Sequence, residues 1–166
     1  SEMRGWTYPL HLIDFETAAV ALPFHAGRRP YEQVAFQFSH HVMHADGRVE
    51  HAGEFLMTEP VAFPNFAFAR ALKRQLENDQ GTVFMWSNHE NTILNKIVDQ
   101  IAGTANSPRD GAELCAFMLS LVKGGDRAMY DLCRLNREAY FHVSTKGSNS
   151  IKKVLPAVMA TSPWLR

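Results

Sequence analysis

The first 57 residues of the chain follow the period of β-strands. Leu10–Glu16 is a short run that is apolar on both sides, which predicts a buried central strand. Pro and Gly interrupt the pattern over residues 17–33, where an irregular loop is expected. Asp46-Gly47 is a two-residue hairpin signal, because Gly tolerates positive φ, so residues 48–57 are expected to return antiparallel. Residues 34–44 alternate, which predicts a half-buried strand with one side formed by Val34, Phe36, Phe38, His40 and Val42.

From residue 60 onward, helical and extended patterns alternate. Apolar residues at four-residue steps, namely Phe68, Leu72 and Leu76, indicate an amphipathic helix. Three strands followed by this alternation predict an α/β fold in which helices cover a mixed sheet. Helices are expected over residues 60–78, 87–103, 110–122 and 148–158, the last stopped by Pro156 or soon after, and strands over residues 82–86 and 128–132.

The length of 166 residues, with 46% hydrophobic and 20% charged residues, fits one globular domain. No apolar run approaches the roughly 20 residues that span a bilayer, so no membrane is expected as a partner. The N-terminus shows no signal segment, and Cys115 and Cys133 form neither a metal spacing nor a disulfide framework, which favours a cytoplasmic protein. The chain opens on Ser-Glu-Met and stops just after Ser-Pro-Trp, so we expect residues 1–166 to be a single domain, truncated at the C-terminus, of a longer chain with further domains.

Charges are distributed unevenly along the chain, although the net charge is zero. Residues 1–122 hold 9 Lys and Arg against 14 Asp and Glu, and residues 123–166 hold 8 against 3, so the net charge changes from −5 to +5. An acidic part beside a basic part suits a protein that binds metal with one region and the phosphates of nucleic acid with the other. The alternative is that the basic part is a solvated face.

Asp14 and Glu16 are the strongest candidates for a functional site. Side chains two residues apart on a strand point to the same face, so both carboxylates project together while Phe15 points into the opposite layer. Two neighbouring negative charges favour a cation between them, and Mg²⁺ or Mn²⁺ prefers carboxylate and water oxygens. The alternative is a solvated strand end, or ion pairs with Arg28 and Arg29.

These residues also carry a resemblance to a known superfamily. Asp-Phe-Glu-Thr at residues 14–17, followed by a hairpin, resembles the first motif of the DEDD, or DnaQ-like, 3′→5′ exonuclease superfamily. Residues 29–39, 89–94 and 146–156 resemble an uncharacterised bacterial domain family that is usually described as an RNase H-like nuclease. The resemblance covers most of residues 10–158, and it implies an RNase H-like five-stranded sheet with strand order 3-2-1-4-5 and an antiparallel second strand.

Further carboxylates are implied by the same resemblance. The superfamily places a third one on the helix after the fourth strand, where Glu90 stands in place of the usual Asp. Alternatively, Glu90 completes a capping box that begins at Ser87, and His89 either contacts substrate or packs beside the strand end. Asp131 is either a group of the metal site or a helix N-cap. In the superfamily, the last carboxylate belongs to an Asp motif that follows a helix, and residues 150–158 correspond to that helix. No such motif stands between this helix and Arg166. The last carboxylate is therefore expected in further sequence, or else the site is incomplete.

A candidate phosphate site lies at the start of the last predicted helix. Helix N-termini bind phosphate through free backbone N–H groups, although serines at such a position also cap helices without any ligand. The polar and basic side chains at this helix start are Ser148, Ser150, Lys152 and Lys153. Basic residues that can follow a nucleic-acid backbone are Arg134, Arg137 and Lys146. Aromatic residues that stack on bases, unless they belong to the core, are Tyr8, Trp86 and Tyr140.

Histidines of the predicted hairpin raise a rival hypothesis. A two-residue turn would place His40, His44 and His51 on one face, and imidazoles suit zinc. No Cys and no fourth ligand stand at a matching spacing, so a solvated hairpin end is expected instead.

Together, these patterns predict a divalent-metal-dependent nuclease that acts on DNA or RNA, and the resemblance implies 3′→5′ exonuclease activity. Asp14, Glu16 and Glu90 would hold two Mg²⁺ or Mn²⁺ ions roughly 3.5 to 4 Å apart, with Asp131 as a further catalytic candidate. Lys152 or Lys153 would hold a neighbouring phosphate. The alternative is a non-catalytic nucleic-acid-binding module that keeps the sheet and the basic helix with an incomplete metal site.

Overall fold

A five-stranded mixed sheet organises the chain in the computed structural model, which describes residues 2–59, 62–104 and 107–163. Its strands are β1 (Leu10–Ala18), β2 (Val34–Met43), β3 (Val49–Leu56), β4 (Val83–Met85) and β5 (Tyr130–Asp131), in the order β3-β2-β1-β4-β5. β2 pairs antiparallel with both neighbours, whereas β4 pairs parallel with β1 and β5. The predicted α/β class, strand order and antiparallel second strand are confirmed.

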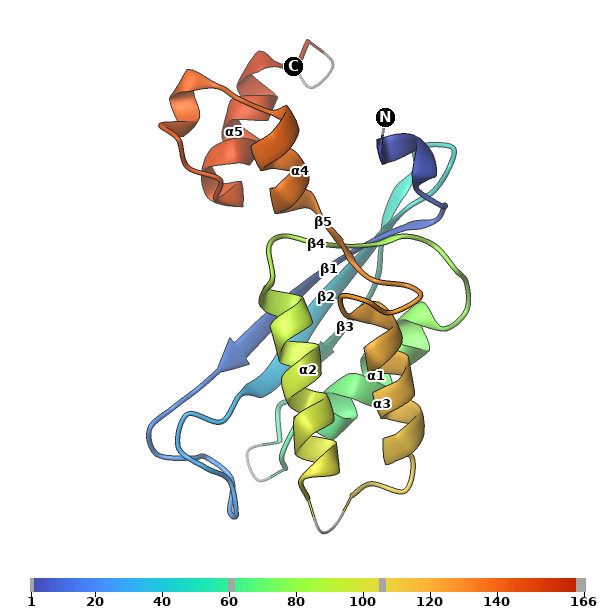
Figure 1. Cartoon of the computed structure of the whole chain (residues 1–166), viewed down its shortest axis with the longest axis vertical. Helices are drawn as coiled ribbons and strands as arrows, with labels where there is room; N and C mark the ends of the chain where they lie inside the picture. The colour runs from blue at the N-terminus through green and yellow to red at the C-terminus, as the bar shows by residue number, and fades with distance from the viewer. Residues whose placement is uncertain (1, 60–61, 105–106, 164–166) are drawn as a thin grey trace.

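Helices cover one face of the sheet and extend past one end (Figure 1). They are α1 (Asn65–Leu76), α2 (His89–Ala102), α3 (Gly111–Leu121), α4 (Leu132–Ala139) and α5 (Ile151–Thr161), with 3-10 helices at Glu2–Gly5 and Val143–Thr145. In Figure 1, α1, α2 and α3 lie against the sheet, whereas α4 and α5 form a separate lobe, residues 132–161, beyond β5. No helix in the described part of the chain is long and apolar enough to cross a membrane.

The hydrophobic core lies between the sheet and the helices α1, α2 and α3. Phe15 of β1 and Phe38 of β2 are buried there, and their rings meet the ring of Phe68 edge-on, with centroids 4.8 and 5.4 Å away. The predicted stripe of α1 is confirmed, because Phe68, Leu72 and Leu76 are fully buried. Each such side chain contributes about 1.5 to 3 kcal/mol by burial. This packing fixes which face of β1 turns away from the helices.

The β2–β3 hairpin turns over three residues rather than two. The His44 N–H donates to Arg48 O, and the Gly47 N–H donates to His44 O, which leaves residues 45–47 in the loop. Gly47 has a φ of +85°, the left-handed conformation that a three-residue hairpin loop needs at this position. The predicted hairpin is therefore confirmed, but its two-residue turn is wrong.

A β-bulge changes which residues of β2 face the core. Glu16 pairs with Gln37 and Thr17 with Ala35, so Phe36 is the extra residue between the two pairs. Ala35 is fully buried as a result, whereas Phe36 is only half-buried. The alternation predicted for β2 is wrong at Phe36 for this reason.

Two helices near the C-terminus differ from the prediction. α4 was expected only in the alternative that makes Asp131 an N-cap, because a helix of eight residues is too short to show a helical period clearly. α5 runs through Pro156 to Thr161 instead of stopping near the proline. A proline removes one backbone hydrogen bond from a helix, and here Val154 and Ala157 on either side of it are buried, which holds the helix together.

Asn65, the first residue of α1, is a fully buried polar residue that joins three segments. Its Oδ1 accepts a hydrogen bond from the Ala35 N–H at 2.8 Å, and its Nδ2 donates to Gln33 O at 3.0 Å and to Gln100 Oε1. These bonds fix the start of α1 at Asn65. The helix was predicted to begin at residue 60, but residues 60–61 lie outside the described residues.

β3 forms one edge of the sheet, and most of its side chains are exposed. They include Glu50, His51 and Glu54. Charged side chains on an edge strand discourage pairing with another chain. β1 has a neighbour on each side, so the predicted carboxylates stand on an interior strand of the sheet.

Candidate functional site

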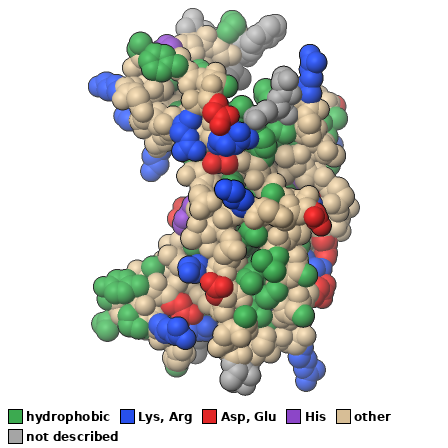
Figure 2. Space-filling model, viewed as in Figure 1, with side chains coloured by type: hydrophobic (Ala, Val, Ile, Leu, Met, Phe, Trp, Pro, Cys, Tyr) green, Lys and Arg blue, Asp and Glu red, His purple; other side chains and the backbone are tan. Residues whose placement is uncertain are grey.

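A pocket of about 380 Å³ opens where β1, β2 and β4 meet the starts of α2 and α5. Its lining includes Leu12, Asp14, Ser39, His41, Trp86, His89, Glu90 and Ile151. Figure 2 shows the molecule indented along one side, below the lobe of α4 and α5, with histidine and acidic side chains in the indentation. The pocket is therefore an open, partly polar site beside the central strand.

Asp14 and Glu16 share one face of β1, as predicted. Both side chains are exposed, whereas Phe15 between them is buried in the core. Asp14 lines the pocket and lies opposite Ser39 in the β1–β2 pairing. Glu16 belongs to the same face but is not among the pocket-lining residues.

Glu90 is buried in the wall of the pocket and is only 3% exposed. Burial raises the pKa of its carboxyl from 4.5 to about 7, a hydrogen bond with its own backbone N–H opposes the rise, and the charges of Asp14 and Asp131 add to it. Its Oε2 has no hydrogen-bond partner among the described residues. A buried polar atom without a partner is costly, so this oxygen is suited to hold a proton or a cation.

The capping box predicted for Ser87 and Glu90 is wrong. The N-cap of α2 is Asn88, whose side chain makes no capping hydrogen bond. Ser87 has a φ of +74°, a left-handed conformation that costs a non-glycine residue about 1 to 3 kcal/mol. The Glu90 side chain is buried in the pocket wall, where it accepts a hydrogen bond from its own backbone N–H instead of reaching back to Ser87.

Asp131 is the N-cap of α4, which confirms one of the two predicted alternatives. Its Oδ1 accepts hydrogen bonds from the N–H groups of Ser87, Cys133 and Arg134, at 2.9, 2.8 and 3.2 Å. Asp131 thus ties the turn before α2 to the start of α4. It is not among the pocket-lining residues, although its charge contributes to the raised pKa of Glu90, and its catalytic role stays a prediction.

The start of α5, where the phosphate site was predicted, borders the pocket through Ile151. Ser150 is the N-cap, but its side chain makes no capping hydrogen bond, so the alternative that it caps the helix is wrong. Ser148 Oγ accepts instead from the Ser150 N–H at 3.3 Å. Lys152 and Lys153 are exposed on the first turn of the helix.

Residues 11–150 match a family described as a domain of unknown function, DUF2779, and the match includes every carboxylate of the candidate site. The chain belongs to the DUF2779 family. Comparison with curated proteins and with solved structures finds no match. The predicted membership of an uncharacterised domain family is confirmed at this level, and the relation to the DEDD superfamily stays a prediction.

Only one of the predicted stacking residues reaches the pocket of this DUF2779 domain. Trp86 lines the pocket, and its Nε1–H donates to Asn149 O at 3.2 Å, which joins the end of β4 to the segment before α5. Tyr8 is exposed, Tyr140 is half-buried, and neither belongs to the pocket lining. The predicted basic residues that also lie outside the lining are Arg134, Arg137 and Lys146.

The sequence prediction missed two pocket residues on β2, Ser39 and His41. The pairing of β1 and β2 places Ser39 opposite Asp14, and His41 opposite Leu12. A signal for them existed, because the alternation of residues 34–44 places both on the side of the strand opposite to Phe38, and this strand pairs with the one that bears the carboxylates. His89, which was expected near the strand end, lines the pocket, and its Nε2 lies 3.4 Å from Thr17 Oγ1.

The rival zinc site on the hairpin is wrong. His40 is buried on the core face, whereas His51 is exposed and lies opposite His41, with ring centroids 4.9 Å apart. A bulge between His40 and His41 and the three-residue turn together change the expected register. Within the described ranges, no group of three or more His, Cys, Asp or Glu side chains is placed to hold a metal ion.

Proposed function

We propose that this DUF2779 domain is a divalent-metal-dependent nuclease that hydrolyses phosphodiester bonds of DNA or RNA. The observation that carries the proposal is the buried, unpartnered Oε2 of Glu90 in a pocket that it shares with Asp14. The resemblance of residues 14–17 to the first motif of the DEDD exonucleases supports the same activity, and with it an RNase H-like relationship and 3′→5′ polarity.

The donor types suit a hard divalent cation. Asp14 and Glu90 line the pocket and offer only carboxylate oxygens, which Mg²⁺ and Mn²⁺ prefer. Glu16 lies outside the lining, and the three carboxylates do not form a metal-holding group in the described residues, so a cation would have to draw them together. Glu90 must lose its proton to bind a cation. Burial disfavours the ionised carboxylate, and the charge of the bound cation would offset this cost. When bound, Mg²⁺ or Mn²⁺ would activate a water molecule and stabilise the leaving 3′ oxygen.

The remaining walls of the pocket suit the rest of a nucleic acid. The first turn of α5 offers backbone N–H groups and the ammonium groups of Lys152 and Lys153, which favour a phosphate next to the one that reacts. Trp86 offers an aromatic surface for a base in the same pocket. In this proposal the carboxylates of the pocket would take the metal, and the basic start of α5 at its border would take the phosphate.

Activity of the purified chain on single- and double-stranded DNA and RNA with Mn²⁺ or Mg²⁺ tests the proposal. We expect metal-dependent cleavage that Asp14→Asn and Glu90→Gln each lower by at least about 100-fold, since loss of a metal ligand costs at least as much as loss of its supporting partner. Isothermal titration with Mn²⁺ alone should show binding that both variants weaken.

The matched control is Asp99→Asn, which removes a negative charge from the exposed end of the same helix as Glu90. It should leave cleavage and Mn²⁺ binding unchanged. If the chain binds Mn²⁺ but cuts neither single-stranded nor double-stranded DNA or RNA, the proposal of a hydrolase is overturned.

One observation favours the second candidate, a nucleic-acid-binding module without catalysis. The Oδ1 of Asp131 is already engaged by three backbone N–H groups, which suits a structural role more than a metal site. In that case the chain should bind single-stranded nucleic acid without cutting it. Lys152→Ala with Lys153→Ala would weaken this binding, and Glu90→Gln would not.

A further inference from the structure

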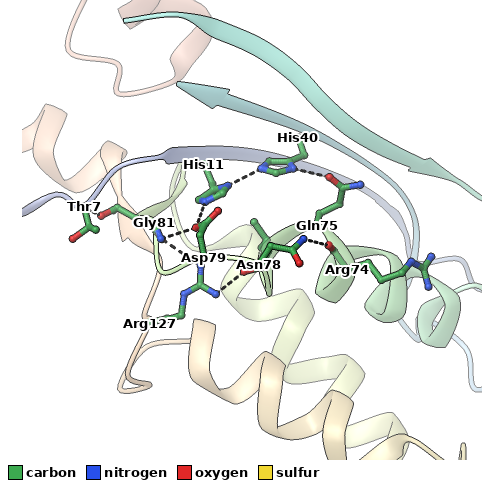
Figure 3. A network of polar contacts seen from close by, with 11 residues as sticks. Thr7, His11, His40, Arg74, Gln75, Asn78, Asp79, Gly81 and Arg127 are labelled. Atoms are coloured by element: carbon green, nitrogen blue, oxygen red, sulfur yellow. Dashed lines mark hydrogen bonds and ion pairs between the residues drawn. The ribbon is translucent and has the colours of Figure 1, made fainter. Parts of the chain in front are cut away.

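A row of four polar side chains crosses the opposite side of the sheet from Asp14 (Figure 3). His11 of β1 and His40 of β2 are both buried, and His11 Nδ1 lies 2.9 Å from His40 Nε2. At the two ends of the row, His11 Nε2 lies 2.9 Å from Asp79 Oδ1, and His40 Nδ1 lies 3.1 Å from the Gln75 amide. These groups bind one another and join the sheet to the end of α1, so the row is structural.

A second pocket of about 690 Å³, the loop pocket, lies toward the end of α2 that is remote from Glu90. One wall is the loop of residues 26–33 between β1 and β2, and the other is the second half of α2 with the residues that follow it. Gln100 Nε2 donates to Gln33 O at 2.9 Å, which joins the two walls. The volume lies within the range of small-molecule sites, and the loop pocket shares no described residue with the candidate site.

The loop wall is held in shape by its own contacts. The Glu32 carboxylate accepts a hydrogen bond from the Arg29 N–H at 2.9 Å and pairs with the Arg28 guanidinium at 3.3 Å. The same guanidinium lies 3.5 Å from the centre of the Phe63 ring. The charges of Arg28 and Glu32 therefore compensate each other, and the pocket is formed before any ligand binds.

Two positive groups of the loop pocket remain available to a ligand, one from each wall. The Arg29 guanidinium is exposed and makes no hydrogen bond or ion pair with the described residues. Lys96 Nζ lies 3.8 Å from Asp99 Oδ2, and both side chains are more than half exposed, so water screens this pair. A guanidinium and an ammonium group are the side chains that bind phosphate most readily.

Tyr31 adds an aromatic surface to the loop pocket. Its side chain lines the pocket and is 69% exposed. Its φ of +59° is left-handed, a conformation that bulky residues rarely adopt, and its N–H donates to Val20 O at 2.8 Å, which helps to hold the backbone there. Strained residues of this kind are concentrated at ligand sites, and an exposed tyrosine ring offers a surface on which a base stacks.

The negative groups of the loop pocket lie toward the end of α2. They are the Asp99 carboxylate and the backbone carbonyl groups of the last turn, which carry the negative end of the helix dipole. These groups oppose a phosphate at that end, and they accept hydrogen bonds from hydroxyl and amino groups. The pocket therefore suits a ligand that has an anionic group, an aromatic ring and hydrogen-bond donors.

We infer that the loop pocket binds a nucleotide, whose phosphate lies against Arg29 and Lys96 and whose base stacks on Tyr31. The inference does not rest on the proposed nuclease activity, because the two pockets are separate. A free nucleotide and the phosphorylated end of a nucleic-acid strand offer the same chemistry to this pocket.

NMR of the nitrogen-15-labelled whole chain, titrated with AMP in EDTA, tests the inference. EDTA removes divalent cations, so metal binding at Asp14 and Glu90 makes no contribution to the result. We expect saturable shift changes at residues 26–33 and in the second half of α2. If AMP shows no saturable binding at millimolar concentrations, or if the changes centre on Asp14 and Glu90, the inference is overturned.

Three variants separate the parts of the ligand. Arg29→Gln and Lys96→Gln each remove a cation and should weaken AMP binding by about tenfold, the worth of one hydrogen bond to a charged group. Tyr31→Asn keeps a residue type that tolerates left-handed backbone, and without the ring it should weaken AMP binding by at least about fivefold and leave binding of inorganic phosphate unchanged. Arg74→Gln, which removes an exposed positive charge from α1, is the control and should bind AMP like the natural chain.

Comparison of ligands decides the class of compound that is bound. Equal affinities for AMP and inorganic phosphate would show an anion site without base recognition and would overturn the nucleotide assignment, as would unchanged AMP binding in both Arg29→Gln and Lys96→Gln. A single-stranded octanucleotide with a 5′ phosphate distinguishes the two sources. Tighter binding than AMP at the same residues identifies the end of a strand, and binding no tighter than AMP identifies a free nucleotide.

Discussion

The carboxyl of Glu90 and the carboxylate of Asp14 line the same pocket, and the charge of Asp14 helps to raise the pKa of Glu90 to about 7. Glu90 is buried, whereas Asp14 is exposed. A change of pH near neutrality therefore changes the charge inside the pocket wall, and this gives the site a measurable signature even before any substrate is known.

The stability of the chain should depend on pH through Glu90. Its folded pKa of about 7 lies above the ordinary value of 4.5, so the folded state holds the proton more tightly than the unfolded chain does. The stabilisation is complete below about pH 4.5 and is lost as the pH rises through 7. At about 1.4 kcal/mol per unit, the free energy of unfolding should fall by about 3 kcal/mol up to pH 8. Urea unfolding at several pH values measures this.

Glu90→Gln should remove this dependence, because the amide has the same shape and no charge. The variant should be more stable than the natural chain at pH 8 and similar to it near pH 5, while Asp99→Asn should follow the natural chain throughout. If Glu90→Gln shows the same fall in unfolding free energy between pH 5 and pH 8, another group causes it.

Loss of the Asp131 cap should destabilise α4 and its connection to α2. Asp131→Ala removes an acceptor shared by the N–H groups of Ser87, Cys133 and Arg134, and should lower the free energy of unfolding by about 1 to 2 kcal/mol. Asp131→Asn keeps an oxygen in the same place and should cost less than half as much. Equal losses in the two variants would mean that the charge matters rather than the capping bonds.

Asn65 should be among the most sensitive polar positions of the core. Asn65→Ala leaves the buried Ala35 N–H without its acceptor and removes the bonds to Gln33 and Gln100, so unfolding free energy should fall by about 2 to 3 kcal/mol. Asn78→Ala, which removes one exposed bond to Arg74 O, is the control and should change it by less than about 0.5 kcal/mol. Chemical denaturation of both variants compares the two sites.

Gly81 should not tolerate a side chain. A Cβ there would collide with the carbonyl oxygen of Pro9 and would lie 2.7 Å from His11 Nε2, the atom that contacts Asp79. Gly81→Ala should therefore cost about 1 to 3 kcal/mol, the range for overpacking. Gly5→Ala has open space around it and should be close to neutral. A neutral Gly81→Ala would show that the segment before β4 moves aside easily.

The strands were predictable because short apolar or alternating runs and the Asp46-Gly47 turn are local signals, and so was the common face of Asp14 and Glu16. The burial of Glu90 was not, since Ser87 and Glu90 have the spacing of a capping box whether or not the side chain turns inward. Only tertiary packing separates the two cases. The row through His11 was equally hidden, because Asp79 lies 68 residues away in sequence and no spacing rule connects them. The bulge at Phe36 is likewise a property of strand pairing rather than of one strand.

The exposed edge strand β3 has a consequence for how the protein behaves at high concentration. Its unpaired backbone groups are a template on which another chain can extend the sheet, and Glu50 and Glu54 place negative charges along that edge. Arg48 and His44 lie beside Glu50, and His51 lies beside Glu54, so the edge carries groups of both signs. Arg48 keeps its positive charge at every pH of storage, and the hydrogen bond with His44 lowers the pKa of Glu50, so the edge stays charged into mild acid and should resist the joining of two hairpins there.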